Sequence, residues 1–312
     1  SIRRQRQMCI RDSSIIAENL GPSSEITKAM IDTLSDGAVL SFGLESADPL
    51  VHSTNWLNCD PKQLISAISH INDYGRERGL RGLPKLLPGL NFIAGLNGET
   101  ASSYQMNLKL LQGIRNKGLL LRRINIRQVE GQGFQDIPEK IFKEFKETVR
   151  NTIDKPLLEE LFPFGSIIRD VWWESHNNRI RDPKQVIDLE HRDISIYGKS
   201  GITFGRQIGA YPILTGIPYL LPLETKSDVI ITGHGMRSIS AVEIGLDINN
   251  VTQNQLSAIP GLGVKGAWKV ISKRAIKLSK NNEKITSVSE AFTSAGVNLS
   301  LIHISEPTRR RG

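Results

Sequence analysis

The sequence predicts an α/β fold: parallel strands of a barrel or an open sheet, then a small β domain and an α-helical C-terminal segment. Three observations support this prediction. Short apolar runs alternate with amphipathic segments over residues 14–158, strand-like runs with Gly and Pro between them fill 159–246, and helical periodicity returns over 247–298. The chain of 312 residues, with 39% hydrophobic and 23% charged residues, has a globular composition and suits about two domains.

The first segment contains three predicted buried strands: Ala38–Leu44, Gly89–Ala94 and Leu119–Ile126. Helices are predicted to begin at Asp60-Pro61, at Thr100 or Ser102-Ser103, and at Pro138. This order indicates parallel strands with right-handed crossovers, either in a barrel or in an open sheet. Three strands alone would leave a sheet edge bare, so we favour a fragment of a barrel.

The second segment contains four strand-like runs: Ser166–Trp173, Asp193–Tyr197, Tyr211–Ile217 and Asp228–Thr232. They predict a small β-barrel or a curled sheet. In the third segment a short helix, Thr252–Ala258, precedes a glycine-rich hairpin and a second helix from Ala267 to about Leu278. The run from Ser287 to Asn298 is expected to begin a second hairpin.

Both ends of the chain resemble in-frame translations of adapters used in sequencing libraries. The two strings are RRQRQMCIRDS from Arg3 and LSLIHISEPTR from Leu299. We therefore expect residues 1–13 and 299–312 to be artefacts, and the genuine segment to be open at both ends. Residues 1–13 and 299–312 hold five of the eight excess positive charges, so the net charge of +8 is a weak indication of a nucleic-acid partner.

The chain has two cysteines, Cys9 and Cys59. They exclude a disulfide framework and a self-contained zinc or iron–sulfur site with cysteine ligands. The histidines lack metal-ligand spacing, so no metal site is predicted. We expect no membrane partner and a cytoplasmic location, because no signal peptide is recognised and prolines interrupt the longest apolar run.

Three segments of the first domain resemble strands four to six of the radical S-adenosylmethionine (SAM) enzymes. They are FGLES at Phe42–Ser46, LPGLNFIAGLNGET at Leu87–Thr100 and RRINIRQ at Arg122–Gln128. The nearest branch resembles the tRNA methylthiotransferases, and a group that ends in a helix-hairpin-helix is more similar still. Asn97 replaces the proline of the family pattern G-L-P-G-E-T.

The resemblance implies that residues 14–158 are the C-terminal half of a partial (β/α)6 TIM-like barrel, followed by a helix-hairpin-helix at the end of the chain. It also implies a SAM site at the carboxyl ends of these strands. The implied cofactor contacts are Glu45, Ser46, Asn91, Gly95, Arg123 and Arg127. A carboxylate suits the ammonium or ribose hydroxyls of SAM, and glycine lets the backbone approach a ligand. The alternatives are that Glu45 caps or pairs locally and that Asn91 is a satisfied core amide. Arg123, Asn125 and Arg127 share one strand face, which either meets the ligand or is solvated.

The resemblance also implies a [4Fe–4S] cluster that is bound by the three cysteines of a C-x3-C-x2-C loop. In that family an electron from the cluster cleaves SAM to a 5′-deoxyadenosyl radical. That loop would lie upstream of Ser14, and an external electron donor would reduce the cluster. We expect the parent protein to be a radical SAM enzyme that modifies a substrate, with nucleic acid as the expected class. This fragment is expected to be inactive because it lacks the loop.

The segment Ile259–Ala267 matches the helix-hairpin-helix motif, in which backbone amides and lysines bind phosphates. Its predicted nucleic-acid contacts are Gly261, Gly263, Lys265 and Lys269, to which Lys273 and Arg274 add positive charge. The alternative is a hairpin used only for packing or protein contact. The second functional hypothesis is therefore a non-catalytic nucleic-acid-binding protein that acts through this hairpin.

Overall fold

The computed structural model describes residues 23–129, 138–177, 194–209, 211–281, 284–285 and 287–296. The adapter-like strings at 1–13 and 299–312 lie outside the described residues. The chain divides into two compact units. The first is Ser1–Leu161 with Gly209–Tyr211, and the second is Phe162–Ile208 with Pro212–Gly312. Each unit is described by itself.

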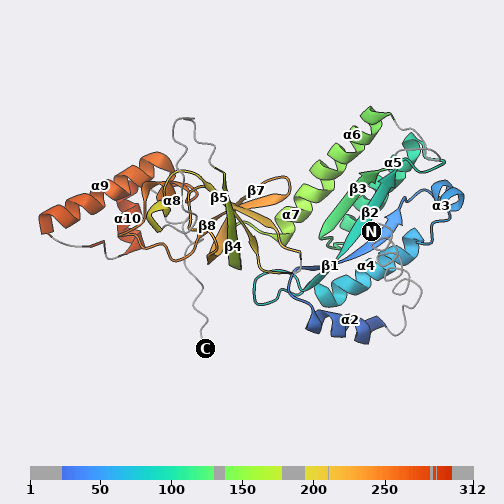
Figure 1. Ribbon diagram of the computed structural model, residues 1–312, viewed down its shortest axis with the longest axis horizontal. Coiled ribbons are helices and arrows are strands. Elements are labelled where there is room, and N and C mark those ends of the chain that lie inside the picture. The colour runs from blue at the N-terminus through green and yellow to red at the C-terminus, as the bar shows by residue number, and fades with distance from the viewer. Residues whose placement is uncertain are drawn as a thin grey trace. The chain divides into compact units, whose positions relative to one another are not determined.

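The first unit is built on a parallel sheet in the order β1-β2-β3 (Figure 1). The strands are β1 (Ala38–Glu45), β2 (Leu86–Ala94) and β3 (Arg123–Gln128). The helices are α2 (Ser23–Thr33), α3 (Pro49–Asn55), α4 (Pro61–Gly75), α5 (Ala101–Asn116), α6 (Glu139–Val149) and α7 (Lys155–Leu161). A π-helical turn, η1 (Arg150–Asp154), joins α6 to α7.

Capping residues set the starts of α4 and α5 where the sequence predicts them. Asp60 accepts a hydrogen bond from the amide of Gln63, and Pro61 stands in the first turn of α4. Thr100 is the N-cap residue of α5, where the hydroxyl of Ser103 accepts a hydrogen bond from the Thr100 amide. Both helices are therefore fixed by local signals.

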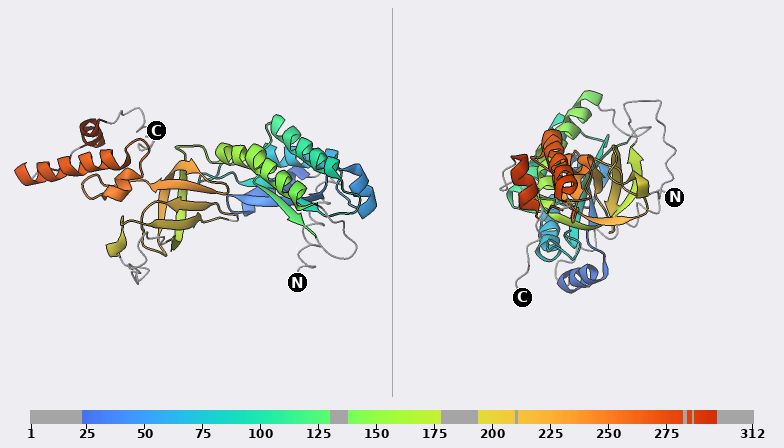
Figure 2. Two further views of the ribbon diagram at one scale, coloured as in Figure 1. Left: turned by 90° about the horizontal axis from the view of Figure 1, so that it is seen from above. Right: turned by 90° about the vertical axis from the view of Figure 1, so that its left-hand side faces the viewer.

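One face of the sheet is apolar and is covered by helices. Its strand residues, Phe42, Leu44, Leu90, Phe92 and Ile124, are at most 5% exposed. The ring of Phe145 in α6 contacts those of Phe92 in β2 and Tyr104 in α5, with centroids 6.5 and 5.2 Å apart. Figure 2 shows α5 and α6 on the same side of these strands. Since side chains alternate along a strand, the residues between these apolar ones form the opposite face.

The prediction of half a (β/α)6 barrel over residues 14–158 is wrong. Strands β1–β3 form a three-stranded sheet, and the closed barrel of the described structure consists of other strands, in the second unit. A barrel fragment and a small sheet give the same sequence pattern, because both alternate short buried strands with helices. The argument from a bare edge fails because an edge strand is tolerated when it is short and charged, as Arg123 and Arg127 make β3.

The second unit contains a closed, mixed barrel in the order β4-β5-β6-β8-β7. Its strands are β4 (Ile167–Asn177), β5 (Ile202–Gln207), β6 (Leu214–Ile217), β7 (Lys226–His234) and β8 (Ser238–Glu243). Neighbouring strands are antiparallel, except that β6 and β8 run parallel. This order with its one parallel pair is the topology of the OB-fold, a five-stranded barrel that commonly binds oligonucleotides and oligosaccharides.

Two strand predictions in this unit need correction. The run Asp193–Tyr197 is not a strand where it is described, because residues Ile194–Ile196 form the 3-10 turn η2. Conversely, β5 and β8 were not predicted as strands. The isoleucines of this run fit a strand, but a turn can also bury an isoleucine, as the fully buried Ile196 shows.

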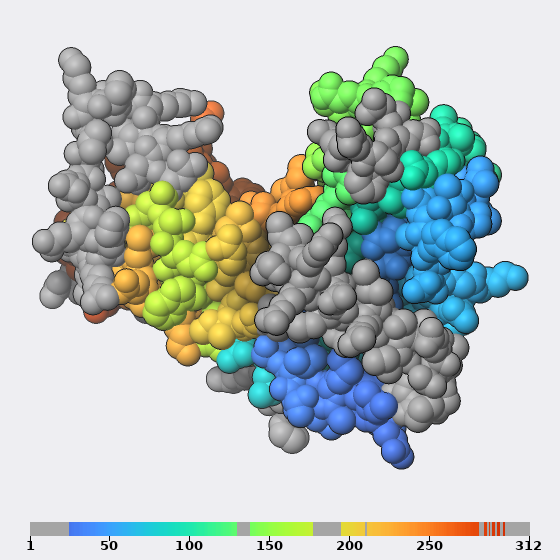
Figure 3. Space-filling view, turned by 45° about the vertical axis from the view of Figure 1, so that its right-hand side comes forward, coloured from blue at the N-terminus to red at the C-terminus, as the bar shows by residue number. Residues whose placement is uncertain are grey.

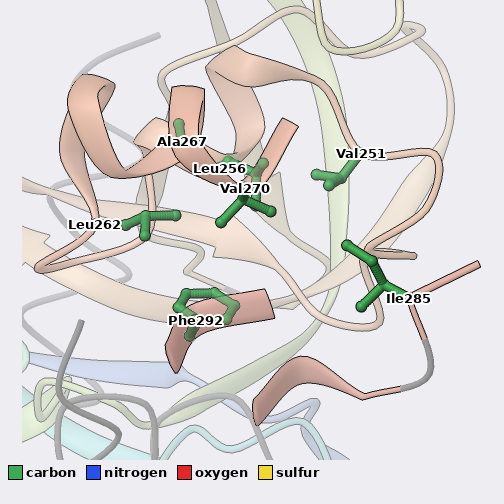
Figure 4. Packing of buried hydrophobic residues seen from close by; sticks show 7 residues of the cluster. All are labelled: Val251, Leu256, Leu262, Ala267, Val270, Ile285 and Phe292. Atoms are coloured by element: carbon green, nitrogen blue, oxygen red, sulfur yellow. The ribbon is translucent and has the colours of Figure 1, made fainter. Parts of the chain in front are cut away.

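The barrel is followed by α8 (Gln253–Ser257), α9 (Gly263–Asn281) and α10 (Val288–Ala295). Figure 4 shows the side chains that these helices and their connections gather into one core: Val251, Leu256, Leu262, Ala267, Val270, Ile285 and Phe292. Helix α9 begins at Gly263, earlier than the predicted start at Ala267. Across the described residues, no helix is long and apolar enough to cross a membrane.

Candidate functional site

The sheet face opposite the helices carries polar side chains near its centre. Gly43 of β1, Asn91 of β2 and Asn125 of β3 are register partners across the three strands. The Nδ2 atom of Asn125 donates a hydrogen bond to Oδ1 of Asn91 over 3.3 Å. Both asparagines are half-buried. Two of the three strands therefore present a side-chain amide on this face, and β1 presents a glycine.

The carboxylate of Glu45 belongs to the same face. Glu45 ends β1 with a φ of 64°, at a register shift between Gly43 and Glu45. Its Oε1 atom lies 2.8 Å from the place that a Cβ on Gly43 would occupy. Glycine at this position therefore leaves the space in which the carboxylate lies over the sheet. A carboxylate on the same sheet face as two amides can bind an ammonium group or a pair of hydroxyls.

Cys59 lies close enough to Glu45 to feel its charge. The thiol is not in a disulfide, and it belongs to the connection between α3 and α4. Burial raises its pKa to about 11, and the carboxylates of Asp60 and Glu45 contribute to the rise. Cys59 is therefore a neutral thiol near pH 7, which makes it a poor nucleophile and a poor metal ligand.

Ser46 is buried in the turn after β1 and does not lie on the polar sheet face. It is fully buried, and its hydroxyl accepts a hydrogen bond from the amide of Asp48 over 3.2 Å. Asp48 in turn caps α3 through the amide of Leu50 and accepts a hydrogen bond from the hydroxyl of Ser103 at 2.6 Å. The Ser46 carbonyl also contacts the ring of His52. Ser46 thus holds the turn after β1.

Gly95 is also part of a turn, which follows β2. It has a φ of 98°, and its amide donates a hydrogen bond to Oε2 of Glu99 over 2.8 Å. The hydroxyl of Tyr104 donates to the same oxygen at 3.0 Å. Burial raises the pKa of Glu99 against these hydrogen bonds, which lower it. The predicted cofactor contact Gly95 therefore stabilises the loop through Glu99.

The two predicted arginines of β3 occupy opposite ends of the strand. The guanidinium of Arg123 lies 5.0 Å from the centre of the Tyr211 ring, at the amino end. Arg127, near the carboxyl end, is exposed. Ile124 packs beneath the helices, so both arginines lie on the face of Asn125.

The structure therefore brings together part of the predicted cofactor set. Glu45, Asn91 and Arg127 lie on the polar face towards the carboxyl ends of the strands. Ser46 and Gly95 lie in the turns after β1 and β2, and Arg123 lies against Tyr211 at the amino end of β3. Sequence reasoning missed the role of Gly43. The Gly-Leu-Glu string contains Gly43 and Glu45. The Glu45 carboxylate reaches back over Gly43 because of the positive φ of Glu45, which the sequence does not reveal.

A depression of about 610 Å³ adjoins the turn after β1. It is lined by Pro49, His52, Ser53, Trp56, Leu57, Asn58, Asp60 and Pro61. In Figure 3 these elements belong to the light blue surface of α3 and the start of α4. Trp56 is 89% exposed beside it. Within the described part of the chain, no group of three or more His, Cys, Asp or Glu residues is placed to hold a metal ion.

A second candidate site is the hairpin between α8 and α9. Gly261 and Gly263 have φ values of 84° and 58°, a conformation that favours glycine, and both are exposed. Leu262 between them is 5% exposed and anchors the turn in the core. No atom lies within 4 Å of a Cβ placed on Gly263. A phosphate can therefore approach the backbone at the start of α9.

The cations of α9 fall into two groups. Lys265 and Lys269 are exposed. Arg274 instead donates hydrogen bonds from Nη1 to the carbonyls of Ile248 and Val251, at 3.2 and 2.8 Å. The guanidinium of Arg274 is therefore held by the fold, which favours a structural role for this residue over a contact with phosphate.

Two further lysines of α9 also bind the protein. Lys277 forms an ion pair with Glu290 at 2.5 Å, and Lys273 donates a hydrogen bond to the Glu290 carbonyl. These contacts hold α10 against α9. The predicted contacts Gly261, Gly263 and the two exposed lysines all lie on or next to the hairpin.

The outer face of the barrel carries aromatic and cationic side chains. Trp172 of β4 is opposite Arg206 of β5 in the register and is 39% exposed. The ring of Phe204 lies over Gly216 of β6, where a Cβ would stand 3.3 Å from it. Arg206 also forms an ion pair with Glu174. Aromatic faces beside arginine are typical of surfaces that stack nucleic-acid bases.

Comparison with known proteins reveals archaeal relatives. No protein-family model matches the chain. An uncharacterized protein of Archaeoglobus fulgidus is 36% identical over 256 residues, which cover 79% of this chain and 44% of that protein. An uncharacterized protein of Methanocaldococcus jannaschii is 34% identical over 238 residues, which cover 73% of this chain and 40% of that protein. The chain thus spans less than half the length of these curated relatives.

Proposed function

We propose that this chain binds nucleic acid through the hairpin between α8 and α9. The observation that carries the proposal is the exposed turn of Gly261 and Gly263, which leads directly into a helix with Lys265 and Lys269 on its surface. The first amides of a helix lack intrahelical partners and attract anions, and nearby lysines add favourable charge. The OB-like topology of the neighbouring barrel adds support by analogy of fold.

The test is the affinity of the chain for fluorescently labelled oligonucleotides as a function of salt concentration. We expect binding to weaken as the salt concentration rises. Lys265→Glu should lower the affinity, and it should reduce the salt slope by the amount expected for about one lost phosphate contact. Lys280→Glu is the matched control, because Lys280 is exposed at the other end of α9. The proposal fails if no oligonucleotide binds at low salt, or if Lys265→Glu binds as the unchanged chain does.

A second candidate function is SAM binding on the polar sheet face, as part of a longer radical SAM enzyme. The observation that favours it is the carboxylate of Glu45 over Gly43, on the same sheet face as the amides of Asn91 and Asn125. Glu45 suits the ammonium group of SAM, and Arg127 suits its carboxylate. Calorimetric titration with SAM tests this candidate. Glu45→Gln should weaken binding, and the exposed Glu147→Gln should not.

The [4Fe–4S] cluster that this candidate requires does not fit the present chain. Such a cluster needs three cysteine thiolates, whereas the chain has two cysteines, and Cys59 carries a neutral thiol. The relatives are more than twice as long as the matched segment. We therefore propose that the cluster and the contact with an electron donor belong to the rest of the longer protein. A full-length gene without a C-x3-C-x2-C loop would refute this candidate.

A further inference from the structure

Helix α9 exposes apolar side chains directly beside its lysines. Val264 is 62% exposed and Trp268 is 58% exposed. Ala267 and Val270 are fully buried, and Figure 4 shows them directed into the core. Residues three and four apart are neighbours on a helix, so Trp268 lies beside Lys265 and Val264. The end of α9 at the hairpin therefore combines an aromatic ring with a cation.

The charge of α9 limits what can cover this ring. The helix contains Lys265, Lys269, Lys273, Arg274, Lys277 and Lys280, and no acidic residue. Lys273, Arg274 and Lys277 are half-buried, and the exposed cations of α9 are Lys265, Lys269 and Lys280. Two of these three lie within one turn of Trp268. A partner that covers the ring is therefore favoured when it brings negative charge close to the ring.

Nucleic acid offers phosphates and flat aromatic bases at short intervals along one chain. In a duplex the bases are stacked on one another, so an exposed ring gains little unless a base is unpaired or a base step is opened. A single strand, a bulge or an overhang presents a base face directly. Trp268 thus favours an unpaired base over a regular duplex.

We infer that Trp268 stacks on an unpaired base of a nucleic acid whose phosphates are bound by Lys265 and Lys269. The inference rests on the proposed function of the hairpin, and it specifies the class of nucleic acid. The hairpin supplies charge that is indifferent to strand structure, and Trp268 supplies the preference for unpaired regions.

The experiment compares four labelled probes of one sequence: single-stranded DNA, single-stranded RNA, a regular DNA duplex and the same duplex with a one-base bulge. Dissociation constants are measured by anisotropy at several salt concentrations. We expect Trp268→Ala to weaken binding of the three probes with unpaired bases by about 5- to 150-fold. Duplex affinity and the salt slope should stay unchanged, because stacking releases no counterions.

Leu278→Ala is the matched control, since Leu278 is a 54% exposed apolar residue at the far end of α9. It should leave every dissociation constant unchanged. Trp268→Phe keeps an aromatic face and should retain most of the affinity, which separates stacking from a loss of fold. The inference is overturned if Trp268→Ala binds all probes normally, or if it weakens duplex and unpaired probes equally.

Tryptophan fluorescence gives an independent measurement. The chain has four tryptophans, Trp56, Trp172, Trp173 and Trp268. Stacking on a base should quench emission in the unchanged chain, and Trp268→Phe should remove that quenching while binding persists. If Lys265→Glu weakens binding but the Trp268 variants do not, the hairpin function stands and the stacking inference falls. If no probe binds, the hairpin function itself fails.

Discussion

The side-chain amide of Asn72 in α4 binds both backbone groups of Leu120, the residue that leads towards β3. Nδ2 donates a hydrogen bond to the Leu120 carbonyl over 3.1 Å, and Oδ1 accepts one from the Leu120 amide over 2.8 Å. Asn72 is 1% exposed, and Nδ2 also donates to the carbonyl of Ile68. One buried side chain therefore satisfies the backbone where the chain enters the sheet.

We expect Asn72→Ala to destabilise the first unit by about 2–4 kcal/mol, because it leaves a buried N–H and a buried C=O of Leu120 without partners. Hydrogen exchange of the β2 and β3 amides measures this loss within the first unit. An unfolding curve of the whole chain would combine the stabilities of both units. Gln63→Ala removes an exposed amide from the same helix and should change stability by less than about 0.5 kcal/mol. A loss below about 1 kcal/mol for Asn72→Ala would contradict the expectation.

Glu99 should make the stability of the first unit depend on pH. Burial raises its pKa above the ordinary value, so the folded state holds the proton more tightly than the unfolded state. Stability should therefore fall as pH rises from the ordinary glutamate pKa through the raised one, and stay reduced above it. Glu99→Gln keeps an acceptor for the Gly95 amide and the Tyr104 hydroxyl but cannot ionise.

The measurement is the difference in unfolding free energy between the unchanged chain and Glu99→Gln across this pH range. The variant should gain relative stability as pH rises, whereas the exposed Glu147→Gln should follow the unchanged chain. If the unfolding free energies of the unchanged chain and of Glu99→Gln change in parallel with pH, the Glu99 carboxyl group titrates alike in the folded and unfolded states, which contradicts the expectation.

Local signals explain what could be predicted from the sequence. Asp60-Pro61 fixes the start of α4, and the alternation around Ile124 assigns Arg123 and Arg127 to the face opposite the helices. The same signal, Asp48-Pro49, precedes α3, a helix that was missed although Asp48 caps it. The seven residues of α3 are too few to show a clear helical period.

Long-range geometry explains what could not be predicted. Whether β1–β3 belong to a barrel or to a sheet depends on partners that the strand pattern does not name. Arg274 and Lys265 are both cations of one helix, but only the fold places the carbonyls of Ile248 and Val251 next to Arg274. The position of the Glu45 carboxylate over Gly43 likewise follows from a positive φ at the end of β1.

Two helical glycines of the first unit should respond oppositely to alanine. A Cβ on Gly113 in α5 would meet nothing within 4 Å, so Gly113→Ala should stabilise the unit by about 0.5–1 kcal/mol through helix propensity. A Cβ on Gly75 would stand 2.0 Å from the Leu86 carbonyl oxygen, so Gly75→Ala must push α4 away from β2. Hydrogen exchange of the β2 and β3 amides in both variants tests the pair. Equal changes in protection would contradict the close packing of α4 on β2.

Arg274 and Lys265 should separate stability from nucleic-acid binding. Arg274→Ala leaves the carbonyls of Ile248 and Val251 without their charged donor, so we expect a loss of about 1–3 kcal/mol in the second unit. Its salt slope for oligonucleotide binding should stay unchanged, because the guanidinium contacts no phosphate in the proposed complex. Lys265→Glu should behave conversely, with a smaller slope and stability within about 0.5 kcal/mol, since Lys265 is exposed. Hydrogen exchange and anisotropy on the same two variants measure both quantities, and a reduced slope for Arg274→Ala would return this residue to the binding surface.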